Sequence, residues 1–367
     1  MNLLMISGDR SILAGKRGAF WYTLEEFSKH WDRIYIICPH VDGAGEATEF
    51  GNVHFHPNPG GLLTQIGWIE RKGRELIAKR HHNVMTVHEY PPFYNGKGAL
   101  RLHRETGIPY MTEVHHIDGF PKPESFRDLV ASFWSRSWLS RKGTARASVV
   151  RVVNMNMKKL LTHWCVQEGK ISVVPSFYLN SQKLIPNPAI VKTFDVVFSG
   201  RIVSNKGLPA LMTAISMLPK ATLLVIGDGP DRVKNEKLAQ RLGIADRVTF
   251  TGWLKEIDDV YTELQRAKVF VMNSTSEGGP RILLEAMALG MPVISTNVGV
   301  APDVIKVFNG VLTTGKPQDL ARQIADLLKN DEKRKRLGEN ARNILSRYDR
   351  ATGVRTYADA LKSIARS

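Results

Sequence analysis

The sequence has very little of what marks a secreted or membrane-spanning protein. It holds two cysteines in 367 residues, Cys38 and Cys165, too few for a disulfide framework and without metal-ligand spacing. Its first residues, MNLLMISGD, are too short for a signal peptide and carry no basic segment. No apolar run approaches the ~20 residues that a membrane span needs. These absences predict a cytoplasmic protein, at most peripheral at the inner face of the cell membrane.

Acidic residues are also scarce relative to basic ones. Lys and Arg number 51 and Asp and Glu number 35, which gives a formal net charge of +16. Such a charge predicts an anionic partner, and it leaves nucleotide phosphates, nucleic acid and an acidic membrane surface all open.

Short apolar runs alternate with amphipathic stretches along almost the whole chain, as is typical of βα units with parallel strands. In the first half, strands are predicted at 2–7, 33–39, 53–57, 83–89, 110–115, 148–154 and 171–176. Helices are predicted between most of them, for example around 62–80 and 156–167.

A linker is predicted at 179–194, which contains two prolines and shows no hydrophobic period. Six further strands follow it: DVVFSG, TLLVIG, RVTFTG, KVFVMNS, PVIST and GVLT. The sequence therefore predicts an α/β protein of two doubly wound domains, 1–185 and 190–345. A C-terminal helix, 346–367, is expected to pack back toward the N-terminal domain.

Candidate ligand-binding loops lie at the carboxyl ends of these strands, where doubly wound sheets hold their ligands. The loop SGRIVSNKG puts Arg201 and Lys206 between two glycines, Gly200 and Gly207, just before a helix. Two cations beside a helix N-terminus suit a phosphate, although two solvated surface side chains remain the alternative. The loop GDGPD, with its two glycines, fits either a binding loop or a plain turn.

The stretch SEGGPRILLEAMALGMPVIST places two glutamates, Glu277 and Glu285, eight positions apart. Glu277 is expected in the loop before a helix that begins near Pro280, and Glu285 about a turn and a half inside that helix. Leu and Met surround Glu285, so it is expected to be partly buried and to need polar partners. Sugar hydroxyls would serve as such partners.

Five ordered motifs resemble the nucleotide-sugar domain of glycosyltransferase family 4 (glycosyl transferases group 1): GRIVSNKG, IGDGP, VTFTGW, SEGGPRILLEAMALGMPVIST and NVGVAPDVI. The resemblance is strong over 195–345 and weaker over 1–190. It implies the GT-B fold, with two Rossmann-like domains facing across a cleft. It also implies retaining transfer of a sugar from a UDP- or GDP-sugar to a saccharide or lipid-linked acceptor, in cell-surface polysaccharide or glycolipid synthesis.

The resemblance also implies roles for individual residues. Arg201 and Lys206 match the diphosphate-binding pair, Glu277 the acid near the donor sugar, and Glu285 the acid that binds the nucleotide ribose. His115 lies where relatives carry a functional histidine. The catalytic set is thus His115, Glu277, Arg201 and Lys206. The donor-binding set is Gly15, Gly18, Gly200, Arg201, Lys206, Gly227, Gly229, Glu277, Gly278, Gly279, Pro280, Arg281 and Glu285.

The nucleotide-diphosphate sugar is expected as co-substrate, with no further cofactor. The chain contains no Asp-x-Asp, the carboxylate pair that usually holds a metal in the other large glycosyltransferase fold. Metal-independent transfer is therefore predicted. Asp303 stands where many relatives carry Glu, a departure at a position not expected to be essential.

The N-terminal half departs more from the family. Candidate acceptor contacts are Lys16, Arg17, Glu89, Tyr90 and His116. The stretch 127–159 holds eight basic residues against one acid. Val130, Trp134 and Trp138 recur there at helical spacing, which fits either core contacts or a helix lying on an anionic bilayer.

Two other functions are weighed against glycosyl transfer. A GT-B-fold sugar-nucleotide epimerase is disfavoured by the Arg/Lys loop together with the two spaced glutamates. A nucleic-acid-binding protein is disfavoured because no recognisable module appears and the positive charge divides evenly between 1–190 and 191–367.

Overall fold

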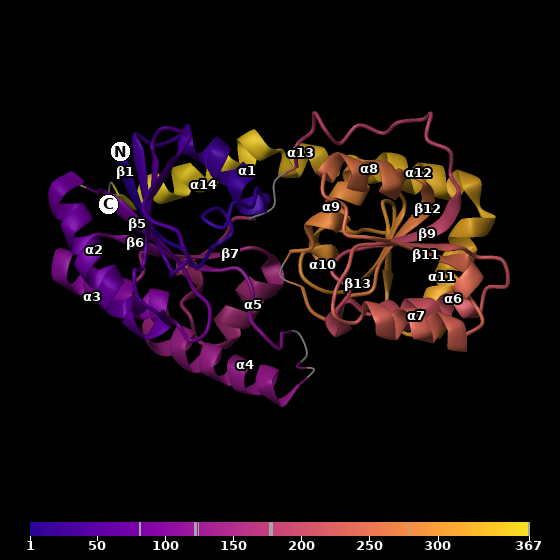
Figure 1. Cartoon of the computed structure of the whole chain (residues 1–367), viewed down its shortest axis with the longest axis horizontal. Helices are drawn as coiled ribbons and strands as arrows, with labels where there is room; N and C mark the ends of the chain where they lie inside the picture. Colours follow the sequence, from indigo (N-terminus) through magenta and orange to yellow (C-terminus); the bar gives the residue numbers. More distant parts are fainter. Residues whose placement is uncertain (81, 121–122, 124, 176–178, 278, 366–367) are drawn as a thin grey trace. The chain divides into compact units, whose positions relative to one another are not determined.

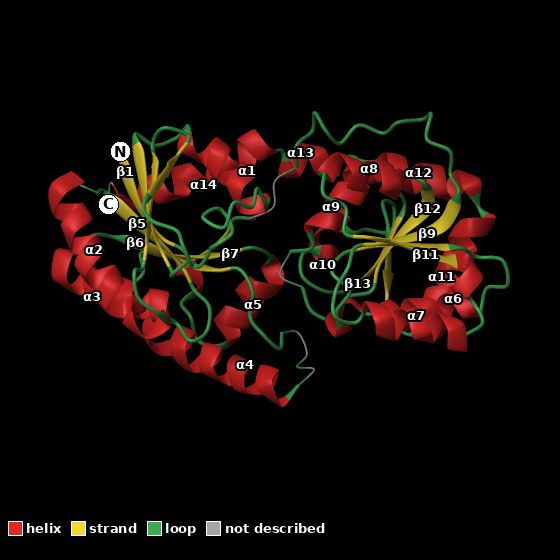
Figure 2. Cartoon of the chain, viewed as in Figure 1, coloured by secondary structure: helices red, strands yellow, loops and turns green. Residues whose placement is uncertain are grey.

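The structure is a computed structural model that describes residues 1–80, 82–120, 123, 125–175, 179–277 and 279–365. The chain divides into two compact units. Unit 1 is built from the described residues of 1–119, 125–178 and 350–367, and unit 2 from those of 120–124 and 179–349. Each unit has its own sheet and its own helices (Figures 1 and 2). None of the described helices is long and apolar enough to cross a membrane.

Unit 1 is built on an eight-stranded sheet in the order β3-β4-β2-β1-β5-β6-β7-β8. Its strands are β1 (Asn2–Ile6), β2 (Arg33–Cys38), β3 (Ala47–Glu49), β4 (Val53–Pro57), β5 (Val84–His88), β6 (Tyr110–Val114), β7 (Val149–Val152) and β8 (Ile171–Val173). All neighbours pair parallel except β3, which runs antiparallel to β4 at the edge. The interior strands are almost wholly buried, as parallel strands covered on both faces should be.

Six α-helices of unit 1 lie within the described residues: α1 (Ala19–Ser28), α2 (Gln65–Arg80), α3 (Tyr94–Thr106), α4 (Phe126–Trp138), α5 (Met155–His163) and α14 (Arg350–Ala365). α1 and α14 lie on one side of the sheet, and α2 and α3 on the other (Figure 1). The last helix packs through Tyr357, whose ring stacks on Phe27 of α1 with centroids 4.7 Å apart. Residues from the end of the chain thus complete the core of unit 1.

Unit 2 is built on a six-stranded, all-parallel sheet in the order β11-β10-β9-β12-β13-β14. Its strands are β9 (Phe194–Ser199), β10 (Leu223–Ile226), β11 (Val248–Gly252), β12 (Ala267–Met272), β13 (Val293–Thr296) and β14 (Val311–Thr313). Its described α-helices are α6 (Leu208–Ser216), α7 (Arg232–Arg241), α8 (Ile257–Gln265), α9 (Arg281–Ala288), α10 (Ala301–Val304), α11 (Pro317–Lys329), α12 (Asp331–Ala341) and α13 (Ile344–Tyr348).

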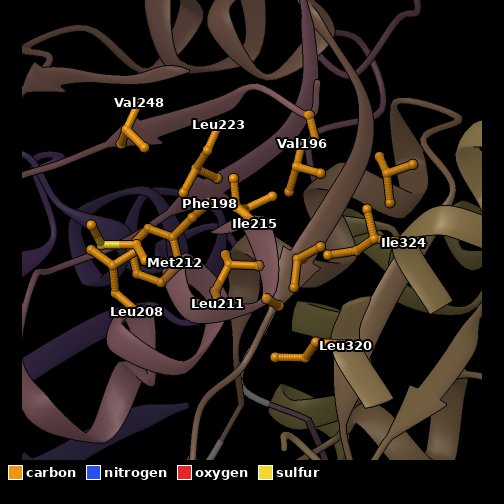
Figure 3. Packing of buried hydrophobic residues seen from close by; sticks show 14 of the residues in the cluster. Val196, Phe198, Leu208, Leu211, Met212, Ile215, Leu223, Val248, Leu320 and Ile324 are labelled. Atoms are coloured by element: carbon orange, nitrogen blue, oxygen red, sulfur yellow. The ribbon is translucent and has the colours of Figure 1, made fainter. Parts of the chain in front are cut away.

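One hydrophobic core of unit 2 lies between the sheet and helices α6 and α11. Leu211 and Met212 of α6 meet Leu320 and Ile324 of α11 against strand residues such as Val196 (Figure 3). The buried α6 residues Leu208, Leu211, Met212 and Ile215 recur at spacings of three and four, and Leu320 and Ile324 lie four apart, so each helix presents one apolar face. This packing fixes α6, and with it the loop that leads from β9 into α6.

Thirteen of the fourteen strands in the described residues fall on runs predicted from the sequence. The exception is β3, whose three residues, Ala-Thr-Glu, are too short and too polar to show a period. The predicted helix around 156–167 ends earlier, at His163, and Cys165 follows with a left-handed backbone, φ 65.

Candidate active site

A pocket in unit 2 lies where the winding of the sheet reverses. β10 and β11 extend the sheet on one side of β9, and β12, β13 and β14 extend it on the other. Doubly wound sheets bind ligands at the carboxyl ends of strands beside such a reversal. A cavity of about 210 Å³ lies there, lined by Phe198, Ser199, Gly200, Lys206, Met272, Ser274, Glu277, Gly279, Pro280, Arg281 and Ile282.

Lys206 and Glu277 form a charged pair in this pocket. Lys206 Nζ donates to Glu277 Oε1, and Ser274 Oγ donates to the same oxygen at 2.8 Å. The two charged side chains are 23% and 13% exposed, so both are partly shielded from water. A phosphate entering the pocket would meet a partly buried cation, and a sugar hydroxyl would meet a carboxylate.

Close backbone contact holds Lys206 in position. The next residue, Gly207, has φ +64, and a Cβ there would lie 2.0 Å from the carbonyl oxygen of Asn273. Asn273 Nδ2 donates to the Gly207 carbonyl at 3.1 Å, and Thr275 N donates to the Asn205 carbonyl at 2.8 Å. The loop after β9 is therefore bound to the loop after β12, which brings Lys206 to Glu277.

The second glutamate, Glu285, is 3% exposed inside α9. Its Oε1 accepts hydrogen bonds from Tyr261 Oη at 2.7 Å and from Arg281 Nε at 2.8 Å. Burial by itself would lower the pKa of Arg281, but Glu285 and Tyr261 together outweigh it and raise that pKa overall. Arg281 lines the pocket, whereas Glu285 is not among the described lining residues. Glu285, the residue predicted to bind the nucleotide ribose, thus already accepts hydrogen bonds from protein side chains.

Three other predicted donor residues of unit 2 lie outside the described lining of the pocket. The side chain of Arg201 is exposed. A Cβ at Gly227 would lie 2.2 Å from the carbonyl oxygen of Gly200, and one at Gly229 would lie 2.3 Å from that of Ile202. These two glycines let the loops after β9 and β10 approach each other, which is a structural role. A fourth predicted donor residue, Gly278, lies outside the described residues.

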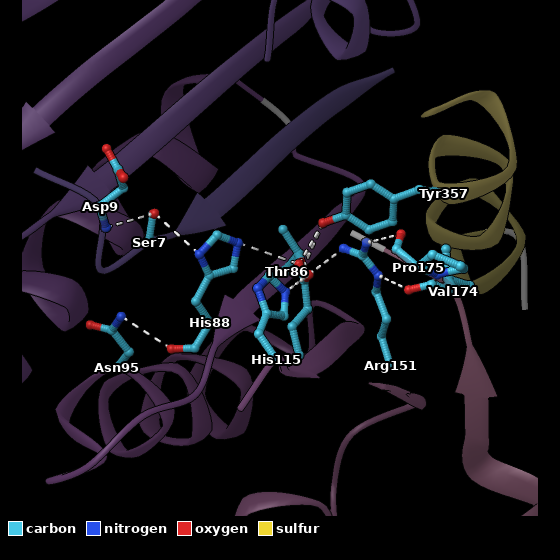
Figure 4. A network of polar contacts seen from close by, with 11 residues as sticks. Ser7, Asp9, Thr86, His88, Asn95, His115, Arg151, Val174, Pro175 and Tyr357 are labelled. Atoms are coloured by element: carbon cyan, nitrogen blue, oxygen red, sulfur yellow. Dashed lines mark hydrogen bonds and ion pairs between the residues drawn. The ribbon is translucent and has the colours of Figure 1, made fainter. Parts of the chain in front are cut away.

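A buried polar network in unit 1 includes His115, Arg151 and Tyr357 (Figure 4), and all three bond to Glu113 of β6. The carboxylate is fully buried. Its Oε1 accepts from Thr86 Oγ1 and from Tyr357 Oη, and its Oε2 accepts from Arg151 Nη1 at 2.5 Å. His115, the predicted catalytic histidine, places its Nε2 2.9 Å from the same Oε2.

The charges in this network keep the Glu113 carboxylate ionised. Burial alone would raise the pKa of Glu113, but Arg151 and the nearby histidines outweigh it and hold that pKa well below its usual range. An ionised carboxylate only accepts, so the Nε2 of His115 donates to it. Burial lowers the pKa of the neighbouring His88 to about 4, so His88 is neutral at pH 7.

His88, Glu113 and His115 also have the spacing of a metal site, with ligand atoms within 4.8 Å of one another. Both Glu113 oxygens, however, already accept from protein donors, one of them the Arg151 guanidinium. A cation would have to displace Arg151 from Glu113. The contacts therefore favour an internal polar network over a metal site.

The basic glycine loop of unit 1 precedes α1. Gly15, Lys16, Arg17 and Gly18 are all exposed, and a Cβ at either glycine would have no neighbour within 4 Å. The Arg17 guanidinium lies over the Trp21 ring, 4.9 Å from its centroid. The loop presents its charges to solvent, and these glycines are not required for packing.

The predicted acceptor contacts at strand ends differ in exposure. His116 is exposed and lies 3.5 Å from Asp118, and Tyr90 is 37% exposed. Glu89 is 5% exposed, and its Oε1 accepts from Trp138 Nε1 at 3.0 Å. Its Oε2 is buried and has no hydrogen-bond partner among the described residues. Glu89 therefore presents no accessible oxygen to an acceptor, and its observed role is to anchor the end of α4.

Sequence reasoning missed Glu113 and Arg151. Both lie inside strands that read as buried, YMTEV and VVRV, and they are register partners in neighbouring strands. An acid and a base in the interior of two such strands must find partners, because burying either charge alone is very costly. That pattern was visible in the sequence, although the partner Tyr357 was not.

Comparisons with known proteins agree with this description. The model for "Glycosyl transferases group 1" matches residues 181–344, and the model for "Glycosyltransferase Family 4" matches residues 20–178. Together these models cover most of the chain. The family resemblance read from the five motifs is thereby confirmed.

Two curated relatives are similar over parts of the chain. The lipopolysaccharide core biosynthesis glycosyltransferase LpsE of Rhizobium meliloti is 34% identical over 46% of this chain and 49% of its own. The sulfoquinovosyl transferase SQD2 of Arabidopsis thaliana is 33% identical over 72% of this chain and 53% of its own. The chain thus spans about half the length of these relatives.

The fold is also that of a solved structure. Sucrose-phosphate synthase from Thermosynechococcus elongatus superposes with a TM-score of 0.83 over 100% of both chains, at 19% identity. The predicted GT-B fold, with two Rossmann-like domains, is confirmed.

Proposed function

We propose that this chain, which belongs to glycosyltransferase family 4 (glycosyl transferases group 1), is a glycosyltransferase that retains the anomeric configuration. It would move a sugar from a UDP- or GDP-sugar to a saccharide or lipid-linked acceptor. The observation that carries the proposal is the Lys206–Glu277 pair in the pocket at the sheet reversal of unit 2.

The chemistry of that pair fits the departure of a nucleotide diphosphate. Negative charge grows on the diphosphate as the sugar leaves, and a fixed cation near the start of a helix stabilises it. Lys206 supplies this charge from the loop before α6, and Arg281 supplies a second cation from the first residue of α9. Glu277 is the acid placed to bind hydroxyls of the donor sugar.

Other residues take roles that the family resemblance implies. Arg201 would reach the diphosphate from its exposed position beside the pocket. Glu285 would bind the ribose only after its bonds to Tyr261 and Arg281 open. His115 would act at the reacting sugar, with Glu113 fixing the orientation of its ring.

The names of the relatives support a role in cell-surface polysaccharide or glycolipid synthesis, since one acts in lipopolysaccharide core biosynthesis and the other is a sulfoquinovosyl transferase. We place the protein in the cytoplasm with a peripheral contact to the membrane and no nucleic-acid partner. The transfer would need no divalent metal, so chelation with EDTA should leave it unchanged.

Calorimetric titration with UDP-glucose and GDP-mannose tests the donor site. Lys206→Ala should weaken binding of the preferred donor about tenfold or more, since a charge-assisted hydrogen bond contributes about 1.5–3 kcal/mol. Lys268→Ala is the matched control. Lys268 pairs with Asp195 at 2.8 Å near the starts of β12 and β9, at the opposite ends of the strands.

If neither nucleotide sugar binds, or both variants bind as the wild type does, the donor site is wrongly assigned. NMR analysis of the product anomer tests retention. Incubation with donor alone separates transfer from epimerisation, because an epimerase would alter the nucleotide sugar without any acceptor.

A further inference from the structure

Helix α4 of unit 1 carries an exposed apolar face that the donor site does not use. Phe126, Leu129, Phe133 and Trp134 are 81%, 53%, 69% and 54% exposed. The first three recur at helical spacing and the fourth adjoins them, so they form one stripe, called here the α4 apolar face. Of the aromatic positions noted in the sequence, Trp138 points inward and Trp134 outward.

The helix that presents this face is held at both ends. At its start, the Ser125 hydroxyl accepts from Asp128 N, and the Asp128 carboxylate accepts from Ser125 N, which makes a capping box. At its end, Trp138 donates to Glu89 and stacks on Phe93 with centroids 5.9 Å apart. The apolar side chains are thus displayed by a formed and anchored helix, and a frayed end does not account for them.

Basic residues accompany the α4 apolar face along the chain. Five of them are exposed: Arg127, Arg136, Arg141, Lys142 and Arg146. None takes part in an ion pair with another described residue. The helix has a single acid, Asp128, which the capping box uses. On an anionic lipid surface, apolar side chains enter the acyl-chain region and basic side chains meet the anionic headgroups. An apolar stripe beside unpaired basic residues fits both regions.

We propose that the α4 apolar face and its basic neighbours dock this chain on an anionic lipid bilayer. A second copy of the chain would bring the same positive charges together, and nucleic acid would leave the aromatic side chains in water. The inference builds on the proposed function, since it brings the enzyme to a lipid-linked acceptor. Lipid binding is nevertheless measured without sugar transfer, so failure of one proposal is distinguishable from failure of the other.

Vesicle co-sedimentation of the full chain tests the docking surface. Vesicles of phosphatidylcholine mixed with phosphatidylglycerol should bind the wild type at least about tenfold more tightly than vesicles of phosphatidylcholine alone. A Phe133→Ser, Trp134→Ser variant should lose about tenfold or more of this binding. An Arg141→Glu, Lys142→Glu variant should also bind less, and it should lose the dependence on salt that screens these charges.

Control variants separate docking from non-specific binding by exposed aromatic side chains and from loss of the fold. Trp253→Ser removes an aromatic side chain of unit 2 that is 76% exposed, and it should bind vesicles as the wild type does. Trp134→Phe keeps an aromatic ring and should retain most of the binding. Circular dichroism and UDP titration check that each variant is folded.

Three outcomes would overturn the proposal. The Phe133→Ser, Trp134→Ser variant could sediment with anionic vesicles like the wild type. Light scattering could show a dimer that this variant dissolves, which would make the face a contact between two copies. Steeply salt-dependent binding to DNA without vesicle binding would make the positive charge a nucleic-acid surface.

Discussion

Glu113 of unit 1 and Glu277 of unit 2 both lie near the carboxyl ends of parallel strands, yet their carboxylates meet different surroundings. Glu113 is fully buried, and both of its oxygens accept from side chains of other chain segments. Glu277 is 13% exposed, and Lys206 and Ser274 share one of its oxygens. One carboxylate joins parts of a fold, and the other faces a pocket.

This difference shows that position at a strand end does not by itself make an acid functional. Saturated hydrogen bonding turns Glu113 into a structural centre that orients His115, whereas a shared oxygen beside a cavity leaves Glu277 able to exchange partners. Stability should therefore depend on Glu113, and ligand binding on Glu277. The following substitutions test that division.

Glu113→Gln should have the largest effect on stability. It leaves the Arg151 guanidinium, 3% exposed, charged and without its anionic partner. Breaking one side of a buried ion pair costs about 3–5 kcal/mol. Urea unfolding followed by circular dichroism should show a loss of that size in the free energy of unfolding.

The matched control for this loss is Glu263→Gln, which breaks a surface pair with Arg266 and should cost less than about 1 kcal/mol. Equal stability of Glu113→Gln and the wild type would contradict the division. It would mean that the carbonyl groups of Val174 and Pro175, which also accept from Arg151, satisfy the guanidinium alone.

Glu89→Gln should change the pH dependence of stability. Burial raises the pKa of Glu89 to about 8, partly offset by Trp138 and Lys97, so this group holds its proton in the folded chain and loses it near pH 4.5 when unfolded. The unfolded state binds fewer protons between these values, so stability falls as pH rises from about 4.5 to 8. Each pKa unit corresponds to about 1.4 kcal/mol, for a total of a few kcal/mol.

Glutamine imitates the protonated acid and removes this loss. Relative to the wild type, Glu89→Gln should therefore gain a few kcal/mol at pH 8 and little at pH 5, measured by urea unfolding at both values. Glu105→Gln, at an exposed pair with Arg74, should show no such difference. If the difference in free energy of unfolding between Glu89→Gln and the wild type were the same at pH 5 and pH 8, Glu89 would be ionised in the folded chain.

Tyr357→Phe should cost about 1–3 kcal/mol, because it removes one donor from the buried Oε1 of Glu113 while the ring stays stacked on Phe27. Thr86→Val removes the other donor to that oxygen and is the matched comparison. Thermal unfolding of both single variants and of the double variant measures how far the two bonds depend on each other. No loss in Tyr357→Phe would show that α14 is held by apolar packing alone.

Most of the strands could be predicted from the sequence, because the strands of both units are short apolar runs. Such a run indicates a buried strand from local sequence alone. It also located the pocket well, since Lys206, Glu277, Gly279, Pro280 and Arg281 all line it. These residues lie in loops whose place at a strand end follows from chain order alone.

What the sequence did not give depends on contacts between distant segments. Tyr357 bonds to Glu113 across 244 positions of the chain, and no local period reports such a contact. Glu285 was expected to be partly buried and to need polar partners, and Tyr261, 24 positions earlier, is one that the sequence did not identify. The outward direction of Arg201 and the outward face of α4 also depend on packing, which a pattern of residue types does not specify.

Glu277→Gln should have the smallest effect on stability and the most specific effect on ligands. The pair with Lys206 is partly exposed, so its loss should cost less than about 1 kcal/mol, as at Glu236→Gln, the control at a surface pair with Arg232. Lys206 loses the carboxylate that competes with phosphate for its charge. Titration with UDP or GDP alone should therefore show equal or tighter binding, while the rate of sugar transfer falls. A tenfold loss of UDP affinity in this variant would instead mean that the Glu277 carboxylate positions Lys206 for the diphosphate. Glu277 would then resemble Glu113, which acts by orienting a neighbouring side chain.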